Sequence, residues 1–176
     1  MPDADLSLAV PAVFFGAVGT AGQRCTSTRR LYLHRSVADQ VLSKLDTLYK
    51  RVSSSQQIGD PLEDATLLGP LHNTKAVDIY SRAIDTLRSQ DAELLTPAGR
   101  FTDAARAGLD KGNFVLPVIA VPKSADPSTG LWRTETFAPI LSVGVFDELE
   151  QAIEWNNGVP QGLSSSLWSM FSSWLC

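Results

Sequence analysis

Two amphipathic helical patterns alternate with short apolar stretches along this chain, and that alternation restricts the possible folds more than any other feature. Apolar residues recur at spacings of three or four over residues 37–52, and the same pattern returns over residues 76–87. Strands are predicted for the short apolar stretches at residues 29–37, 92–95, 114–121 and 140–146. Helices and strands alternating at these lengths predict an α/β fold, with a mainly parallel sheet and flanking helices.

Two further helices are predicted near the ends of the chain. Residues Leu6 to Val18 are apolar on nearly every side, so we expect a helix that is buried all round and bent at Pro11. Residues Glu148 to Asn156 predict the last helix, because Gly158 and Pro160 follow where a helix would end.

Composition excludes several classes of function. The chain has 176 residues, which suits one domain, and a net charge of −4 without a basic stripe, which argues against nucleic-acid binding. No apolar run is long enough to span a membrane, and the acidic start lacks the basic region of a secretory signal. Cys25 and Cys176 cannot form a disulfide framework, and neither His34 nor His72 lies at metal-ligand spacing, so we expect no metal site.

Cys25 is the strongest candidate for chemistry. It lies in a glycine-rich loop, residues 19–28, where a thiolate could attack a carbonyl carbon close to backbone N–H donors. Arg24 beside it could attract an anionic substrate. The alternative is that Cys25 is an inert small apolar residue, as many single cysteines are. A thiol hydrolase with His34 as base is disfavoured, because no orienting Asn or Asp is evident.

Other motifs are weaker by themselves. Gly16, Gly19 and Gly22 match neither a dinucleotide fingerprint nor a P-loop, so we interpret them as close helix packing followed by a flexible loop. Glu135 could accept hydrogen bonds from a ribose diol, and Phe137 could lie against a flat ring. Alternatively, Glu135 is a surface carboxylate and Phe137 a core residue at the start of a strand.

Six motifs follow one another along the chain: GTAGQRCTSTRRLYLH, GDPL, TLLGPLHNTKAVDIY, GNFVLP, TETFAPILSV and NNGVPQGLSSSLW. In this order they resemble the NAD-dependent aldehyde dehydrogenase superfamily, from about Asp3 to Leu167. The segments GTAGQRC and TETFAPIL look most like the antiquitin branch, the α-aminoadipic semialdehyde dehydrogenases. The resemblance covers about a third of a full family member and implies part of its catalytic domain.

The resemblance implies a role for each matched residue. Cys25 matches the nucleophile that attacks the aldehyde, giving a thiohemiacetal and then a thioester that water hydrolyses, and its N–H matches one arm of the oxyanion hole. Glu135 matches the residue that binds the nicotinamide ribose of NAD, and Phe137 the one that packs near the nicotinamide. Arg24 is our own hypothesis, as the partner of a carboxylate on a semialdehyde substrate. The activity implied is the NAD-dependent oxidation of an aldehyde to a carboxylic acid.

The resemblance also implies that other parts of the enzyme lie outside this sequence. The cofactor domain, the oxyanion-hole Asn and the general-base Glu lie upstream in the family, so we expect Met1 to be an internal methionine and the isolated chain to be inactive. The expected division is a catalytic-domain portion, residues 1–167, and a divergent tail, residues 168–176, from a changed reading frame, retained intron or alternative exon. The parent enzyme would be a homo-oligomer, a tetramer, in the cytoplasm or mitochondria, and this chain lacks most of its oligomerisation elements. The alternative is a truncated isoform or gene-model fragment that at most interacts with full-length subunits.

Overall fold

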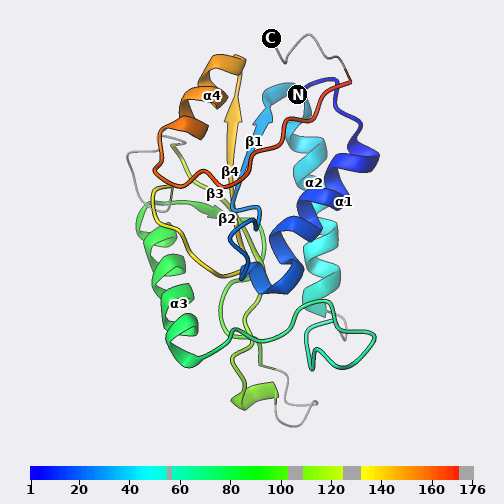
Figure 1. Ribbon diagram of the computed structural model, residues 1–176, viewed down its shortest axis with the longest axis vertical. Coiled ribbons are helices and arrows are strands. Elements are labelled where there is room, and N and C mark those ends of the chain that lie inside the picture. The colour runs from blue at the N-terminus through cyan, green and yellow to red at the C-terminus, as the bar shows by residue number, and fades with distance from the viewer. Residues whose placement is uncertain (55–56, 103–108, 125–131, 171–176) are drawn as a thin grey trace.

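A four-stranded sheet forms the centre of the computed structural model, which describes residues 1–54, 57–102, 109–124 and 132–170 (Figure 1). The strands lie in the order β1 (Arg30–His34), β4 (Ile140–Phe146), β3 (Val118–Val121) and β2 (Glu93–Leu94). Strands β1 and β3 both run parallel to β4, whereas β2 pairs antiparallel with β3 at one edge. The prediction of a mainly parallel sheet is therefore confirmed.

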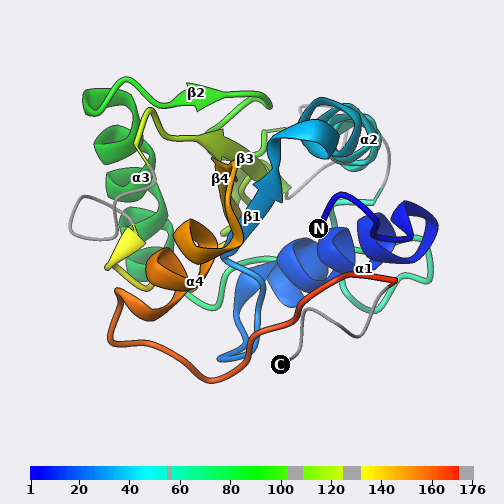
Figure 2. The same ribbon diagram turned by 90° about the horizontal axis from the view of Figure 1, so that it is seen from above.

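Helices cover both faces of this sheet. Helices α1 (Leu6–Val18) and α2 (Arg35–Ser54) lie on one side, and α3 (Thr74–Ser89) and α4 (Leu149–Asn157) on the other (Figure 2). The described residues also form two short 3-10 turns, η1 (Gly19–Gly22) and η2 (Leu109–Lys111). All four predicted helices are present, and α2 follows β1 without a connecting loop.

Burial of one apolar face explains why the amphipathic segments form helices. Helix α2 buries four of the residues that the periodicity selects, Val41, Leu45, Tyr49 and Val52, while the other three, Val37, Leu42 and Leu48, are only partly buried. Helix α3 begins where the side chain of Asn73 accepts a hydrogen bond from the N–H of Ala76, at 2.9 Å. Helix α4 ends at Asn157, one residue later than predicted, and Gly158 caps it. Both faces of the central strand β4 are covered, which accounts for its continuous apolar sequence.

Helix α1 differs from the prediction of burial on all sides. It packs against α2 and β4 through one face, but Leu8 is 63% exposed and Phe15 is 56% exposed on the other. The expectation was wrong because, among the described residues, no segment covers that outer face. The helix also continues through Pro11 rather than ending there. No helix within the described ranges combines the length and apolar character that crossing a bilayer requires.

The end of the described chain lies beside its beginning. The amino group of Met1 donates to the carbonyl oxygen of Trp168 at 3.0 Å, and the carboxylate of Asp3 accepts from the hydroxyl of Ser169 at 2.6 Å. The predicted divergent tail begins here, and its residues 171–176 lie outside the described residues.

Candidate functional site

The loop that carries Cys25 has an unusual backbone. Thr20, Ala21 and Gly22 have φ angles of 56°, 54° and 68°, so three successive residues adopt the left-handed region. The chain then makes a tight turn in which the N–H of Ser27 donates to the carbonyl of Arg24 at 3.1 Å. Cys25 is the second residue of this turn, and its side chain is exposed.

Three long-range contacts hold this loop (residues 19–28) in place; we call it the nucleophile loop after the role proposed for Cys25 below. The N–H of Thr28 donates to the carbonyl of Gly16 in α1 at 2.9 Å. The side-chain amide of Gln23 donates to the carbonyl of Pro70 at 3.2 Å and accepts from the N–H of His72 at 3.0 Å. The sequence predicted a flexible loop, but these bonds join it to α1 and to the connection before α3.

A second loop, residues 133–138, carries Glu135 and Phe137 and leads into β4. Its backbone touches the nucleophile loop: a Cβ atom built at Gly22 would lie 2.3 Å from the carbonyl oxygen of Ala138. Since real Cβ atoms do not approach oxygen so closely, only glycine allows this contact. The structure therefore brings together two loops that are more than a hundred residues apart in the sequence.

Arg29 joins the two loops, and the sequence analysis missed it. Its guanidinium donates four hydrogen bonds to backbone carbonyls: to Ser27 at 3.0 Å, Gly22 at 3.2 Å and Arg24 at 2.8 Å in the first loop, and to Thr136 at 3.1 Å in the second.

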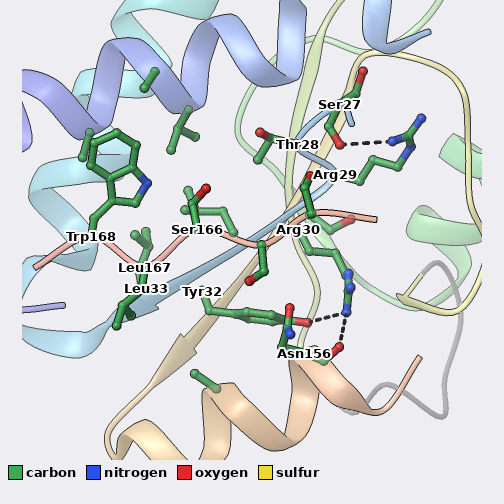
Figure 3. A pocket seen from close by; sticks show the side chains of 18 of the residues that line it. Ser27, Thr28, Arg29, Arg30, Tyr32, Leu33, Asn156, Ser166, Leu167 and Trp168 are labelled. Carbon is green, nitrogen blue, oxygen red and sulfur yellow. Dashed lines mark hydrogen bonds between the residues drawn. The ribbon is translucent and has the colours of Figure 1, made fainter. Parts of the chain in front are cut away.

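Arg29 precedes β1, and in an extended strand neighbouring side chains point to opposite faces. Figure 3 shows Arg29 and Arg30 leaving the chain in different directions, Arg30 toward Tyr32 and Asn156.

The electrostatics of the site centre on the same arginine. Burial lowers the pKa of Arg29 from its ordinary value, while the nearby Glu135 carboxylate and the Cys25 thiolate act to raise it. An arginine remains protonated at neutral pH despite such a shift, because its ordinary pKa is far above 7. The site therefore holds a partly buried positive charge that interacts with both a thiol and a carboxylate.

A cavity of about 790 Å³ opens next to these loops. Cys25, Thr28 and Glu135 line it together with residues of α1, β1 and the segment 161–168. Figure 3 shows Trp168 at one end of this cavity, with Ser27 and Thr28 toward the other. Of the four predicted site residues, Cys25 and Glu135 line this cavity, while Arg24 and Phe137 lie outside its wall.

The thiol-hydrolase alternative and the core position of Phe137 find no support in the described part of the chain, whereas Glu135 is exposed, as a surface carboxylate would be. The ring nitrogen Nδ1 of His34 lies 2.8 Å from the hydroxyl oxygen of Ser36, and His34 has no hydrogen bond with Cys25. Phe137 is 41% exposed, so it is not the core residue of the alternative interpretation. Within the described residues, no three His, Cys, Asp or Glu side chains are grouped closely enough to bind a metal ion.

Comparisons with known proteins agree with this fold. The model of the Aldehyde dehydrogenase family matches residues 1–173. A pea (Pisum sativum) protein, aldehyde dehydrogenase family 7 member A1, is 49% identical over 169 residues, which are 96% of this chain and 30% of that protein. Mouse (Mus musculus) alpha-aminoadipic semialdehyde dehydrogenase is 42% identical over 95% of this chain and 29% of its own length.

Solved structures give the same result. The betaine aldehyde dehydrogenase of Staphylococcus aureus, in complex with NAD⁺, superposes with a TM-score of 0.85 at 25% identity. The match covers 96% of this chain and 32% of that one. This chain thus spans about 30% of the length of the curated relatives it matches.

Proposed function

Because this chain belongs to the aldehyde dehydrogenase family, we propose that it supplies the nucleophile and part of the cofactor site for NAD-dependent oxidation of an aldehyde to a carboxylic acid. The observation that carries the proposal is the contact between the loop of Cys25 and the loop of Glu135 and Phe137. The reaction is that of a longer enzyme, since the relatives are about three times as long as the match.

Cys25 fits the role of nucleophile. Its thiol lies exposed at the tip of a turn, where an aldehyde carbon can reach the Sγ atom. Within the described residues the N–H of Cys25 has no protein acceptor, so it can donate to the oxygen that becomes negative when sulfur attacks. The bonds from Gln23 and Thr28 restrain the backbone that carries this N–H and the thiol.

Glu135 and Phe137 fit the nicotinamide end of NAD, which supplies the hydride acceptor when it is bound. The side chain of Glu135 is 32% exposed, so its carboxylate can accept hydrogen bonds from ribose hydroxyls. Phe137 presents an exposed part of its ring on the same loop, where a flat ring can pack against it. Neither residue binds the pyrophosphate, so these two side chains hold only one end of the cofactor.

Arg24 supports a substrate with a carboxylate, such as α-aminoadipic semialdehyde. Its side chain is exposed beside Cys25 and carries a positive charge. The name of the mouse relative points to the same class of aldehyde. We expect Arg24→Ala to raise the KM for semialdehydes that carry a carboxylate but not for uncharged aldehydes. An unchanged KM for acidic aldehydes would remove Arg24 from the substrate site.

The test is a chimera, because the 176-residue chain alone should produce no NADH from NAD and an aldehyde. In the full-length pea relative, the 169 matched residues are replaced with the matching residues of this chain, and NADH is followed at about 340 nm. We expect turnover that Cys25→Ala abolishes. A folded chimera without turnover, or turnover that survives Cys25→Ala, would overturn the proposal. NADH production by the isolated chain above its own Cys25→Ala control would refute the expectation of inactivity.

A further inference from the structure

Arg29 makes contacts that no other described side chain of the site makes, because they reach both loops at once. Three of its hydrogen bonds go to carbonyls of the nucleophile loop, those of Gly22, Arg24 and Ser27. The fourth goes to the carbonyl of Thr136, between the two residues assigned to the cofactor. The Arg29 side chain is only 16% exposed, and its bonds to Thr136, Ser27 and Gly22 are partly buried, whereas the bond to Arg24 faces solvent.

The same guanidinium contacts the side chains of Glu135 and Phe137 but forms no hydrogen bond with the Glu135 carboxylate. Its nitrogen Nη1 lies 3.7 Å from the nearer carboxylate oxygen of Glu135, which is an ion pair but too long for a hydrogen bond. The carboxylate lone pairs therefore remain available to ribose hydroxyls. The carbon Cζ of Arg29 lies 4.5 Å from the ring centre of Phe137, a cation–π contact that fixes the ring plane.

We propose that Arg29 is a positioning residue, which sets Glu135 and Phe137 at a fixed distance from Cys25 and so aligns the nicotinamide with the nucleophile. This proposal rests on the proposed function for the roles of those three residues. The planar guanidinium is essential, since one partly buried group contacts four carbonyls, the carboxylate of Glu135 and the ring face of Phe137. Lysine keeps the charge but loses this planar group.

Hydrogen–deuterium exchange on the 176-residue chain tests the coupling without any catalysis. We expect Arg29→Met to speed exchange about tenfold in peptides of both loops, residues 22–28 and 133–138, with Arg29→Lys in between. Arg30→Met is the matched control: Arg30 donates to the carbonyls of Trp155 and Asn156, so its loss should affect the end of α4 instead. Unchanged exchange in residues 133–138 of Arg29→Met, with the helical signal retained, would overturn the proposal.

Kinetics of the chimera separate positioning from a general loss of folded protein. A loss of folded enzyme lowers kcat and leaves KM unchanged, whereas misplaced Glu135 and Phe137 weaken binding of the cofactor. We expect Arg29→Met to raise the KM for NAD about tenfold and Arg29→Lys to restore part of it. Arg35→Met, which removes an exposed ion pair with Asp147, should leave that KM unchanged. An Arg29→Met chimera with normal KM for NAD would contradict the proposal.

The exchange experiment and the chimera kinetics distinguish a failure of this proposal from a failure of the proposed function. An inactive chimera with Arg29 intact would count against the proposed function, while the exchange result on the chain would still decide whether Arg29 couples the loops. An active chimera in which Arg29→Met changes neither exchange nor KM would leave the proposed function standing and remove Arg29 from it.

Discussion

Gly22→Ala is the substitution that most directly perturbs the contact between the two loops. Gly22 has a φ of 68°, and the nearest atoms to an added Cβ are backbone atoms of Ala138 and Pro139, not flexible side chains. The Cβ–oxygen distance of 2.3 Å must grow to at least 3.0 Å, so one loop has to move by about 0.7 Å.

Two effects add in the expected loss of stability. The left-handed backbone costs alanine about 1 kcal/mol relative to glycine. Separating the loops strains the backbone and weakens the Arg29 bond to Thr136, which is 3.1 Å long, and together these cost about 2 kcal/mol more. We therefore expect Gly22→Ala to lower the free energy of unfolding by about 3 kcal/mol.

Two other glycines separate these effects. Gly99 has a φ of 141°, in a region that glycine alone adopts readily, and no atom within 4 Å of an added Cβ, so Gly99→Ala should show a backbone cost without a clash, about 1–3 kcal/mol. Gly162 has neither feature, and Gly162→Ala should change stability by less than about 0.5 kcal/mol. Urea unfolding followed by circular dichroism measures all three variants. A loss of no more than about 1 kcal/mol for Gly22→Ala, which is the left-handed backbone cost by itself, would refute the predicted clash between the loops.

Three further predictions concern two buried tyrosines. The hydroxyl of Tyr49 is fully buried without a hydrogen-bond partner among the described residues, so Tyr49→Phe should leave the free energy of unfolding unchanged or raise it by about 1 kcal/mol. The hydroxyl of Tyr80, in contrast, donates to the carbonyl of Leu116 at 2.8 Å and accepts from the N–H of Gly99 at 3.1 Å. Tyr80→Phe should therefore lower the free energy of unfolding by about 1–2 kcal/mol in the same urea assay. Equal effects of the two substitutions would contradict these assignments. Burial raises the pKa of Tyr80 from 10.0 to about 12, so the unfolded chain loses this proton at a lower pH than the folded chain does. The free energy of unfolding should therefore fall as the pH rises from about 10 to about 12, and Tyr80→Phe should make that fall shallower. An unchanged slope would show that Tyr80 titrates normally.

Local patterns in the sequence predicted the regular elements well. The spacing of Val41, Leu45, Tyr49 and Val52 selects the buried face of α2, because a helix repeats every 3.6 residues whatever it packs against. The same reasoning was wrong for α1, since an apolar pattern reports which surfaces prefer burial and not whether a partner segment is present. Leu8 and Phe15 are apolar in sequence but exposed in the structure.

The site was only partly predictable for a related reason. Cys25 and Glu135 stand out as residue types in motifs, whereas Arg29 and Gln23 act through bonds to backbone carbonyls that only the folded chain brings near. The available signal for Arg29 was its position next to Arg30 at the start of a strand. Neighbouring strand residues face opposite sides of a sheet, so one of the two guanidinium groups must point inward and find hydrogen-bond acceptors within the protein. The close approach at Gly22 left no signal beyond the glycine itself.

The central claim is that Cys25 forms the covalent bond to the substrate beside the loop of Glu135 and Phe137. Mass spectrometry of the chimera, quenched in acid during turnover with NAD and an aldehyde, tests it most directly. The account predicts the acyl mass of that aldehyde on the peptide that contains Cys25, and its loss in Cys25→Ala. NADH production without that mass, or with the acyl group on another residue, would contradict it.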